Sequence, residues 1–389
     1  MAENIGVGII GMGWMGAAHA RAYLQIRHRF PESRLYPELV VCSDNTADRC
    51  EHAKNMLGFA RSTRDWHDVV DDPNVSVVNI TAPNNFHLEM VRAAASAGKH
   101  IFCEKPVGRS PKETAEIART AEESGALTWV GYNYRWAPLV QHARSLISEG
   151  TLGNITHYRG RFFAGYASHP DGVLSWRFQR PLAGSGALGD LMSHVVDMAH
   201  MLAGPIYRVV GQKALFVNDR PIIPDGEGTH FSVVAGGKRE PVTNEDYAGA
   251  LIEFENGGHG TFEVCRVIQG IKSQMAFEIH GTQGAIRWDF ERMNELQLFT
   301  EEGSHDGFIT LKSGPEYPGH LNFNPGPAVG LGYDDLKTLE AYHFLQSIAS
   351  GKQGEPSFKQ ALAVARVLGA IERSWSSDRW EKIHEGETN

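Results

Sequence analysis

The chain has 389 residues, of which 42% are hydrophobic and 21% are charged, and its formal net charge is −9. This length favours two domains, each large enough for its own core. The negative charge argues against a nucleic-acid surface, and the lack of an apolar run of about 18–20 residues argues against a membrane span.

A glycine-rich stretch near the start of the chain predicts a dinucleotide site. An apolar run over residues 5–10 leads into Gly11, Gly13 and Gly16, spaced G-x-G-x-x-G, and a helical pattern follows over 15–26. The three glycines permit a tight turn, close approach of a pyrophosphate, and packing of the helix on the strand. The N–H groups and dipole of the first helical turn then favour phosphate charge. The alternative is a parallel-sheet protein whose first turn merely needs glycine.

The next apolar run, over residues 39–42, ends at Ser43 and Asp44. A carboxylate at this strand end is where the adenosine ribose of NAD would lie, although Asp44 is farther from Gly16 than is usual. Asn45 and Thr46 follow instead of a cation. Because a 2′-phosphate would meet the charge of Asp44, the sequence predicts NAD rather than NADP.

Strand and helix patterns alternate up to about residue 131, which predicts a doubly wound parallel sheet with ligands at the carboxyl ends of its strands. Strands are expected over 75–80, 100–103 and 127–130, and helices over 85–97 and 111–124, the second opened by a capping box at residues 110–113. Polar residues follow two of these strands, at 81–87 and 104–106. Lys105 either points into the ligand crevice or is a loop lysine paired with Glu104, and the residues alone leave both possibilities open.

Residues 132–389 have the pattern of an α+β domain with a large, mostly antiparallel open sheet. Asn256-Gly257 predicts a hairpin, and alternating apolar residues predict half-buried strands. The expected helices are 138–149, 334–350 and 357–376, and the expected strands are 154–163, 247–255, 259–266, 274–280, 286–290 and a short one near Trp380. We expect helices on one face of this sheet and another subunit on the other, hence a homodimer or homotetramer.

A helical pattern over residues 187–202 carries Asp190, His194 and Asp197. Asp190 and His194 are four residues apart and so share a helix face, and Asp197 is expected on the same stripe. A carboxylate one turn from an imidazole suits a general base for an alcohol. An ion pair on the surface, or a buried histidine held by hydrogen bonds, would give the same pattern.

Taken together, these motifs resemble those of the Gfo/Idh/MocA oxidoreductases, and the resemblance extends over the whole chain. It is carried by the glycine triplet, by Thr81-x-Pro83 with His87, by Gly98-Lys99-His100 ahead of Glu104-Lys105-Pro106, and by the segment 131–135. In that family the lysine of Glu-Lys-Pro lies between nicotinamide and substrate, and Asp-x-x-x-His lies on the later helix. The resemblance therefore implies a catalytic trio of Lys105, Asp190 and His194.

The resemblance and the strand ends together define the candidate binding residues. For the cofactor these are Gly11, Gly13, Trp14, Met15, Gly16, Asp44, Thr81, Ala82, Pro83, Asn84, His87, Glu104, Lys105, Asn133, Trp176 and Arg177. For the substrate they are Lys105, Tyr134, Tyr166, Arg177, Asp190, His194 and Tyr333, of which the tyrosines could equally be polar-tipped core residues.

The implied activity is an NAD-dependent dehydrogenase that oxidises a secondary hydroxyl of a sugar, glycoside or anhydrosugar, with most similarity to glycoside and anhydrosugar 3-dehydrogenases. An inositol dehydrogenase and a glycosidase that retains NAD are alternatives. A non-catalytic dinucleotide-binding regulator is a weaker one, because such proteins tend to lose the lysine or the histidine.

The expected compartment is the cytoplasm, since the N-terminus runs directly into the first strand with no leader segment. The four cysteines contain no C-x-x-C pair, which fits reduced thiols rather than disulfides. The histidines outside the trio have no metal-ligand spacing, so no metal is expected.

Overall fold

The computed structural model describes residues 3–224, 229–301 and 306–383, and the chain forms two compact units. The first unit runs up to residue 133 and also includes residues 332–362, whereas the second comprises 134–331 and the residues from 363 onward. The expected domains were 1–131 and 132–389. The first boundary lies close to the one in the structure, but the expected division left the late segment 332–362 in the second domain.

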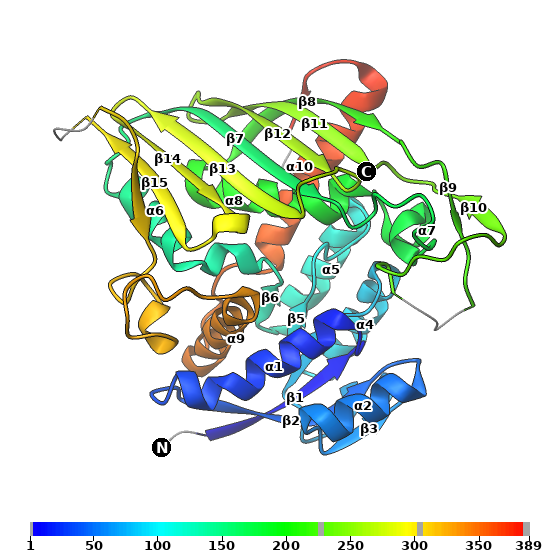
Figure 1. Ribbon diagram of the computed structural model, residues 1–389. Helices are drawn as coiled ribbons and strands as arrows, with labels where there is room; N and C mark the ends of the chain where they lie inside the picture. Colours follow the sequence, from blue (N-terminus) through cyan, green and yellow to red (C-terminus); the bar gives the residue numbers. More distant parts are fainter. Residues whose placement is uncertain (1–2, 225–228, 302–305, 384–389) are drawn as a thin grey trace. The chain divides into compact units, whose positions relative to one another are not determined.

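The first unit is built on a parallel six-stranded sheet with the order β3-β2-β1-β4-β5-β6 (Figure 1). The strands β2 and β3 are added on one side of β1, and β4 to β6 are added on the other. This order is that of a doubly wound dinucleotide-binding sheet, as predicted. The strands are β1 (Glu3–Ile10), β2 (Leu35–Ser43), β3 (Arg61–Thr63), β4 (Val77–Ile80), β5 (His100–Cys103) and β6 (Thr128–Val130).

Helices cover both faces of this sheet, and the late helix α9 is one of them. Phe344 of α9 packs against Phe102 on β5 and Trp129 on β6, each at a centroid distance of 5.7 Å. These aromatic side chains explain why residues 332–362 belong to the first unit. The helices are α1 (Trp14–Arg29), α2 (Ala47–Leu57), α3 (His67–Val70), α4 (His87–Ser96), α5 (Pro111–Ser124) and α9 (Tyr333–Ser350).

The second unit is built on a nine-stranded sheet with the order β16-β15-β14-β13-β7-β12-β11-β8-β17. It is antiparallel except for the pair formed by β7 and β12, which is parallel. The strands are β7 (Ile155–Ala164), β8 (Ile206–Ala214), β11 (Tyr247–Phe254), β12 (His259–Cys265), β13 (Ser273–Gly281), β14 (Gly284–Asp289), β15 (Glu295–Thr300), β16 (Ile309–Lys312) and β17 (Glu381–Lys382). A separate hairpin-like pair joins β9 (Asp219–Pro221) and β10 (Arg239–Pro241). The predicted turn at Asn256-Gly257 is present, with Gly257 at φ +86° between β11 and β12.

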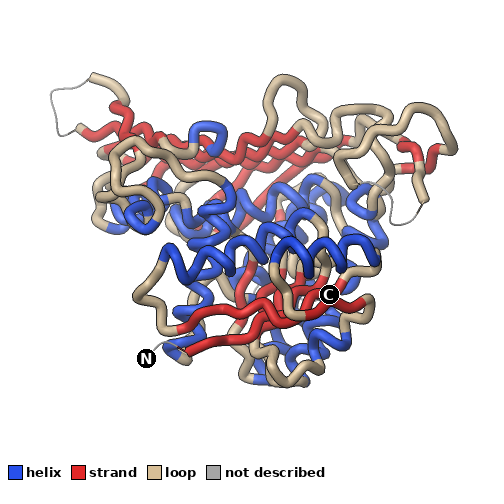
Figure 2. The backbone as a smooth tube through the Cα atoms, turned by 60° about the horizontal axis from the view of Figure 1, so that its bottom comes forward, coloured by secondary structure: helices blue, strands red, loops and turns tan. Residues whose placement is uncertain are grey.

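Helices of this unit lie along one side of the nine-stranded sheet, whose strands run across the top of Figure 2. Tyr158, Phe262 and Phe277 are buried on that side. The opposite face is mainly polar: Arg161 donates to Gln274 across the strands at 3.1 Å, and Leu251 is a large apolar side chain there with 53% exposure. The helices are α6 (Pro138–Ser148), α7 (Arg180–Ala183), the π-helix η4 (Leu188–Met192), α8 (Ser193–Ala203) and the part of α10 (Phe358–Ser377) from residue 363 onward.

Within the described residues, no helix combines the length and the apolar character that crossing a membrane requires.

Candidate active site

The glycine-rich turn at the end of β1 has the geometry that a pyrophosphate needs. Gly11 has φ +93°, a conformation that side chains rarely adopt. A Cβ on Gly16 would lie 2.0 Å from the Gly11 carbonyl oxygen, so only glycine lets α1 begin this close to the strand. A Cβ on Gly13, by contrast, would meet nothing within 4 Å. The turn is therefore closed on the protein side and open where the phosphates of NAD would lie against the start of α1.

Asp44 follows β2 directly and braces the same turn. Its carboxylate accepts hydrogen bonds from the Met12 N–H at 2.8 Å and the Thr46 N–H at 2.9 Å. The guanidinium of Arg49 lies 3.7 Å away. Each carboxylate oxygen has a second lone pair that could accept a hydrogen bond from a ribose hydroxyl. The hydrogen bonds within the protein therefore leave Asp44 able to bind the ribose of NAD, and this contact remains a prediction.

The segments after β4 and β5 are tied to the glycine turn and to each other. Thr81 Oγ1 donates to the Gly11 carbonyl at 2.5 Å. His87 is fully buried, with Nε2 2.9 Å from the Ala82 carbonyl and Nδ1 3.1 Å from the Pro106 carbonyl. Burial lowers the pKa of His87, although the carbonyl contacts oppose this, and the side chain braces the two loops. Pro83 and the buried Asn84 form the intervening turn.

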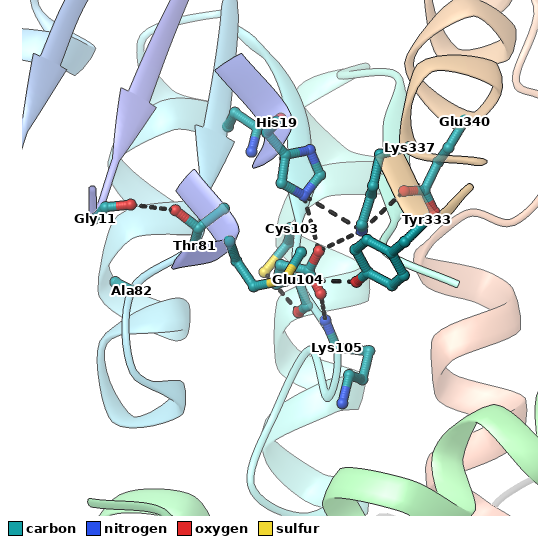
Figure 3. A network of polar contacts seen from close by, with 12 residues as sticks. Gly11, His19, Thr81, Ala82, Cys103, Glu104, Lys105, Tyr333, Lys337 and Glu340 are labelled. Carbon is teal, nitrogen blue, oxygen red and sulfur yellow. Dashed lines mark hydrogen bonds and ion pairs between the residues drawn. The ribbon is translucent and has the colours of Figure 1, made fainter. Parts of the chain in front are cut away.

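Glu104, directly before the candidate lysine, is the centre of a buried polar network (Figure 3). Its Oε1 lies 2.8 Å from His19 Nε2 and 2.7 Å from Lys337 Nζ. Its Oε2 accepts the main-chain N–H of Lys105 at 3.2 Å. Figure 3 shows the amine end of Lys105 directed away from this carboxylate. This favours the interpretation in which Lys105 faces a ligand over the one in which it pairs with Glu104.

Two aromatic residues flank the glycine turn in the first unit. Trp14, 53% exposed at the start of α1, stacks on Tyr333 of α9 at a centroid distance of 5.3 Å. The Tyr333 hydroxyl lies 3.6 Å from Met15 Sδ. Tyr333 was expected to contact substrate. In this unit it lies between Trp14 of the cofactor turn and the Glu104 network, and a substrate contact remains a prediction. Asn133 ends the unit as a buried residue of a 3₁₀ turn.

The second unit holds Asp190 and His194 on one continuous helical segment, as the sequence predicts, but Asp190 lies in a π-helical turn. The π-helix η4 covers residues 188–192 and runs directly into α8. Such turns are uncommon and occur frequently at functional sites. Asp190 Oδ2 accepts a hydrogen bond from the Tyr166 hydroxyl at 2.9 Å. Burial, and next the Asp190 charge, raise the pKa of Tyr166, so this tyrosine stays a neutral donor.

His194 is 5% exposed and enclosed by aromatic rings. The Tyr134 ring meets it edge-on at 4.8 Å, and the Phe162 ring lies at 5.8 Å. Tyr134 also contacts Phe290 at 4.8 Å. Within this unit, Tyr134 therefore helps to fix the imidazole ring, and a bond from Tyr134 to a sugar remains a prediction.

Asp197 was expected on the same stripe as Asp190 and His194, and it lies on the same helix as His194. Its carboxylate forms a two-point ion pair with Arg135, at 2.5 and 2.6 Å, and both side chains are buried. Asp197 therefore serves to neutralise a buried guanidinium, a role that helical spacing alone could not separate from catalysis.

Trp176 and Arg177 form the short turn η3 (Trp176–Phe178), whose main chain is held by buried polar residues. The Arg177 guanidinium lies 4.4 Å from the centroid of the Trp176 ring. The Arg177 carbonyl accepts from Asn244 at 3.0 Å and from Arg266 at 3.3 Å. Both arginines also act on the Tyr166 hydroxyl electrostatically, which places positive charge near the Tyr166–Asp190 bond.

Two of the buried polar groups beside the candidate residues were missed in the sequence. Arg266, with its partner Asp246 at 2.7 Å, is fully buried at the end of β12, and Lys337 is 1% exposed on α9. The available signal for Lys337 was its spacing of three residues from Glu340, next to the apolar positions Leu336 and Leu339. That spacing is common on solvated helix faces, so it did not single the pair out.

Comparison with known proteins agrees with this description. Residues 5–132 match the family model described as oxidoreductase family, NAD-binding Rossmann fold, and residues 140–287 match the GFO/IDH/MocA C-terminal domain. The chain is 37% identical over 384 residues to levoglucosan dehydrogenase of Pseudarthrobacter phenanthrenivorans, covering 98% of both chains. It is 24% identical over 352 residues to the NAD⁺-linked scyllo-inositol 2-dehydrogenase of Bacillus subtilis, covering 90% of this chain and 88% of the relative.

A solved structure of levoglucosan dehydrogenase in complex with NADH and levoglucosan superposes with a TM-score of 0.92 at 36% identity, and the match covers 98% of this chain and all of the other. The fold and the glycine turn define an NAD-dependent oxidoreductase. The chain belongs to the Gfo/Idh/MocA family.

Proposed function

We propose that this protein oxidises a secondary hydroxyl of an anhydrosugar or glycoside of the levoglucosan type. The observation that supports this most directly is the similarity over nearly the whole chain to levoglucosan dehydrogenase, including a structure that holds levoglucosan. Lys105, Asp190 and His194, which the family resemblance implies as the catalytic trio, are all present. An oxidised carbon at C3 is part of the same proposal.

In the proposed reaction, His194 accepts the proton of the substrate hydroxyl as general base. The amine of Lys105 donates a hydrogen bond to the same oxygen and so stabilises its developing negative charge. Asp190, held by the Tyr166 hydroxyl, orients the imidazole. When NAD is bound, it supplies the hydride acceptor.

The test is to follow NADH formation at 340 nm with levoglucosan, simple glycosides, free sugars and inositols, each at the same concentration. We expect kcat/KM with levoglucosan or a glycoside to exceed that with inositols by about tenfold or more. A preference for inositols would mean that the substrate is a cyclitol and not an anhydrosugar. Cleavage of a glycoside without net NADH would show a glycosidase that retains NAD, and no turnover of any of these would favour a regulator.

The second proposal concerns cofactor choice. With the best substrate, we expect kcat/KM to be at least about tenfold higher with NAD than with NADP, because the Asp44 carboxylate would repel a 2′-phosphate. Asp44→Ser should reduce this ratio, mainly by weakening NAD. Because Asp44 also binds the Met12 N–H, absolute rates are expected to fall with both cofactors, so the ratio is the informative measurement. Equal efficiency of the wild type with both cofactors would contradict the assignment.

We further propose a cytoplasmic homodimer or homotetramer that associates through the open face of the nine-stranded sheet. Leu251, 53% exposed on that face beside Val210 of the neighbouring strand, would be covered by the second copy. Light scattering at micromolar concentration should give a mass of two or four chains, and Leu251→Arg should shift it toward one chain. A monomeric mass for the wild type would rule this arrangement out.

A further inference from the structure

The network behind Glu104 contains more buried charge than a structural link between a helix and a sheet requires. Glu104, Lys337 and Glu340 all have side chains less than a tenth exposed, and His19 joins them with no exposure at all. Lys337 Nζ lies 2.7 Å from Glu104 and 3.0 Å from Glu340. Burying such ions is costly unless each is paired, so the arrangement persists only because its members complement one another.

The protonation states in the network follow from these contacts. Although burial raises the pKa of Glu104, Lys337 and the His19 hydrogen bond lower it well below its usual range. Burial and the charge of Lys337 lower the pKa of His19 to about 4. His19 is therefore neutral, with its proton on Nε2 facing the carboxylate. Burial alone would lower the pKa of Lys337, but the two carboxylates raise it overall, so Lys337 is an ammonium ion.

The carboxylate held in this way has one oxygen left for the catalytic segment. Oε1 is occupied by His19 and Lys337, and Oε2 accepts the Lys105 N–H. Space for this orientation comes from Gly131, where a Cβ would lie 2.5 Å from the Glu104 carboxylate. A rotation of the Glu104 side chain would therefore release the main chain of Lys105.

We propose that Lys337 is a positioning residue for Lys105, acting through Glu104: its ammonium fixes the carboxylate that holds the Lys105 main chain, so that the Lys105 amine stays directed at the substrate oxygen. This rests on the proposed function of Lys105. Figure 3 shows the chain of contacts from Glu340 through Lys337 and Glu104 to the main chain of Lys105.

The first test compares Lys337→Met, Glu104→Gln and the double variant with the wild type. Small displacements of a reacting group lower turnover strongly, so we expect Lys337→Met to lower kcat about tenfold or more, with KM for NAD within about twofold. Because Lys337 acts through Glu104, the double variant should have a kcat within about twofold of that of Glu104→Gln alone. Because Lys337 also pairs with Glu340, adding Glu340→Gln to the double variant removes the buried charges together, and this variant serves where Lys337→Met folds poorly.

A second measurement does not depend on activity. Hydrogen exchange of the peptide containing Lys105 should show faster exchange of the Lys105 amide in Lys337→Met and Glu104→Gln than in the wild type. Lys99→Met is the matched control, since this lysine of the same unit donates to the carbonyls of Asp72 and Val75. It should change neither kcat nor Lys105 exchange by more than about twofold.

The proposal would be overturned by a Lys337→Met protein with wild-type kcat, by independent multiplicative effects of the two substitutions, or by unchanged protection of the Lys105 amide. Failure of the proposed function looks different. In that case the wild type itself would not oxidise carbohydrates, while the exchange measurement would still report whether Lys337 holds the Lys105 main chain.

Discussion

Lys105→Ala and His194→Ala are each expected to lower kcat by roughly 10²–10⁴, because each removes a group that acts on the transferred proton or on its oxygen. NAD binding, measured by quenching of tryptophan fluorescence, should remain within a few-fold of the wild type. For Lys105 this follows because its amine takes no part in the hydrogen bonds by which Thr81 and His87 hold the cofactor turn. For His194 it follows from the fact that this residue is a candidate for substrate contact and not one of the candidate cofactor-binding residues.

Two exposed residues supply the controls for these substitutions. Lys112 is exposed on α5 and His28 is exposed near the end of α1, so their alanine variants should retain kcat within about twofold. Near-normal turnover of Lys105→Ala or His194→Ala would remove that residue from the mechanism. If a variant lost NAD binding together with turnover, the substitution would instead have disrupted the fold of the unit in which it lies.

Asp197→Asn is expected to lower the free energy of unfolding of the second unit by about 3–5 kcal/mol, because it leaves the buried Arg135 guanidinium without its counter-charge. Side-chain exposure is 5% for Arg135 and 2% for Asp197. Urea unfolding followed by far-ultraviolet circular dichroism measures the change. The double variant Arg135→Met/Asp197→Leu should recover much of the loss, since no unpaired charge remains.

Glu253→Gln is the matched control for that experiment. Its partner Arg208 is 41% exposed on the same sheet, so water screens the pair and the expected loss is below about 1 kcal/mol. If Asp197→Asn and Glu253→Gln lowered the free energy of unfolding equally, the buried Arg135–Asp197 pair would contribute no more to stability than an exposed pair.

Most of the first unit could be predicted because its longer elements carry local signals. The run of β1, the three glycines and the capping residue Ser110, whose hydroxyl accepts from the Glu113 N–H, are all set within a few residues of sequence. Short elements such as β3 and α3 were not predicted, because three or four residues are too few to show a periodic pattern.

The site was predicted in part, and the limit is again physical. The helical spacing placed Asp190, His194 and Asp197 on one helical run, as the structure has them, but it could not indicate which partner each carboxylate binds. What separates the two carboxylates is a partner distant in sequence: Tyr166 for Asp190 and Arg135 for Asp197. Likewise, Lys337 lies more than two hundred residues from Glu104. Pairings of this kind depend on the tertiary fold and leave no local pattern.

The late segment that completes the first unit also sets the order in which the chain is able to fold as it is synthesised. Until α9 has left the ribosome, Glu104 has no ammonium beside it, and Phe102 and Trp129 lack the packing of Phe344. Domains usually fold in the order in which they emerge. Here the unit begun by the first 133 residues is completed only by residues 332–362, so residues 134–331 emerge in full before the amino-terminal unit is complete. A nascent chain paused before residue 332 therefore presents an unfinished dinucleotide unit to chaperones and proteases.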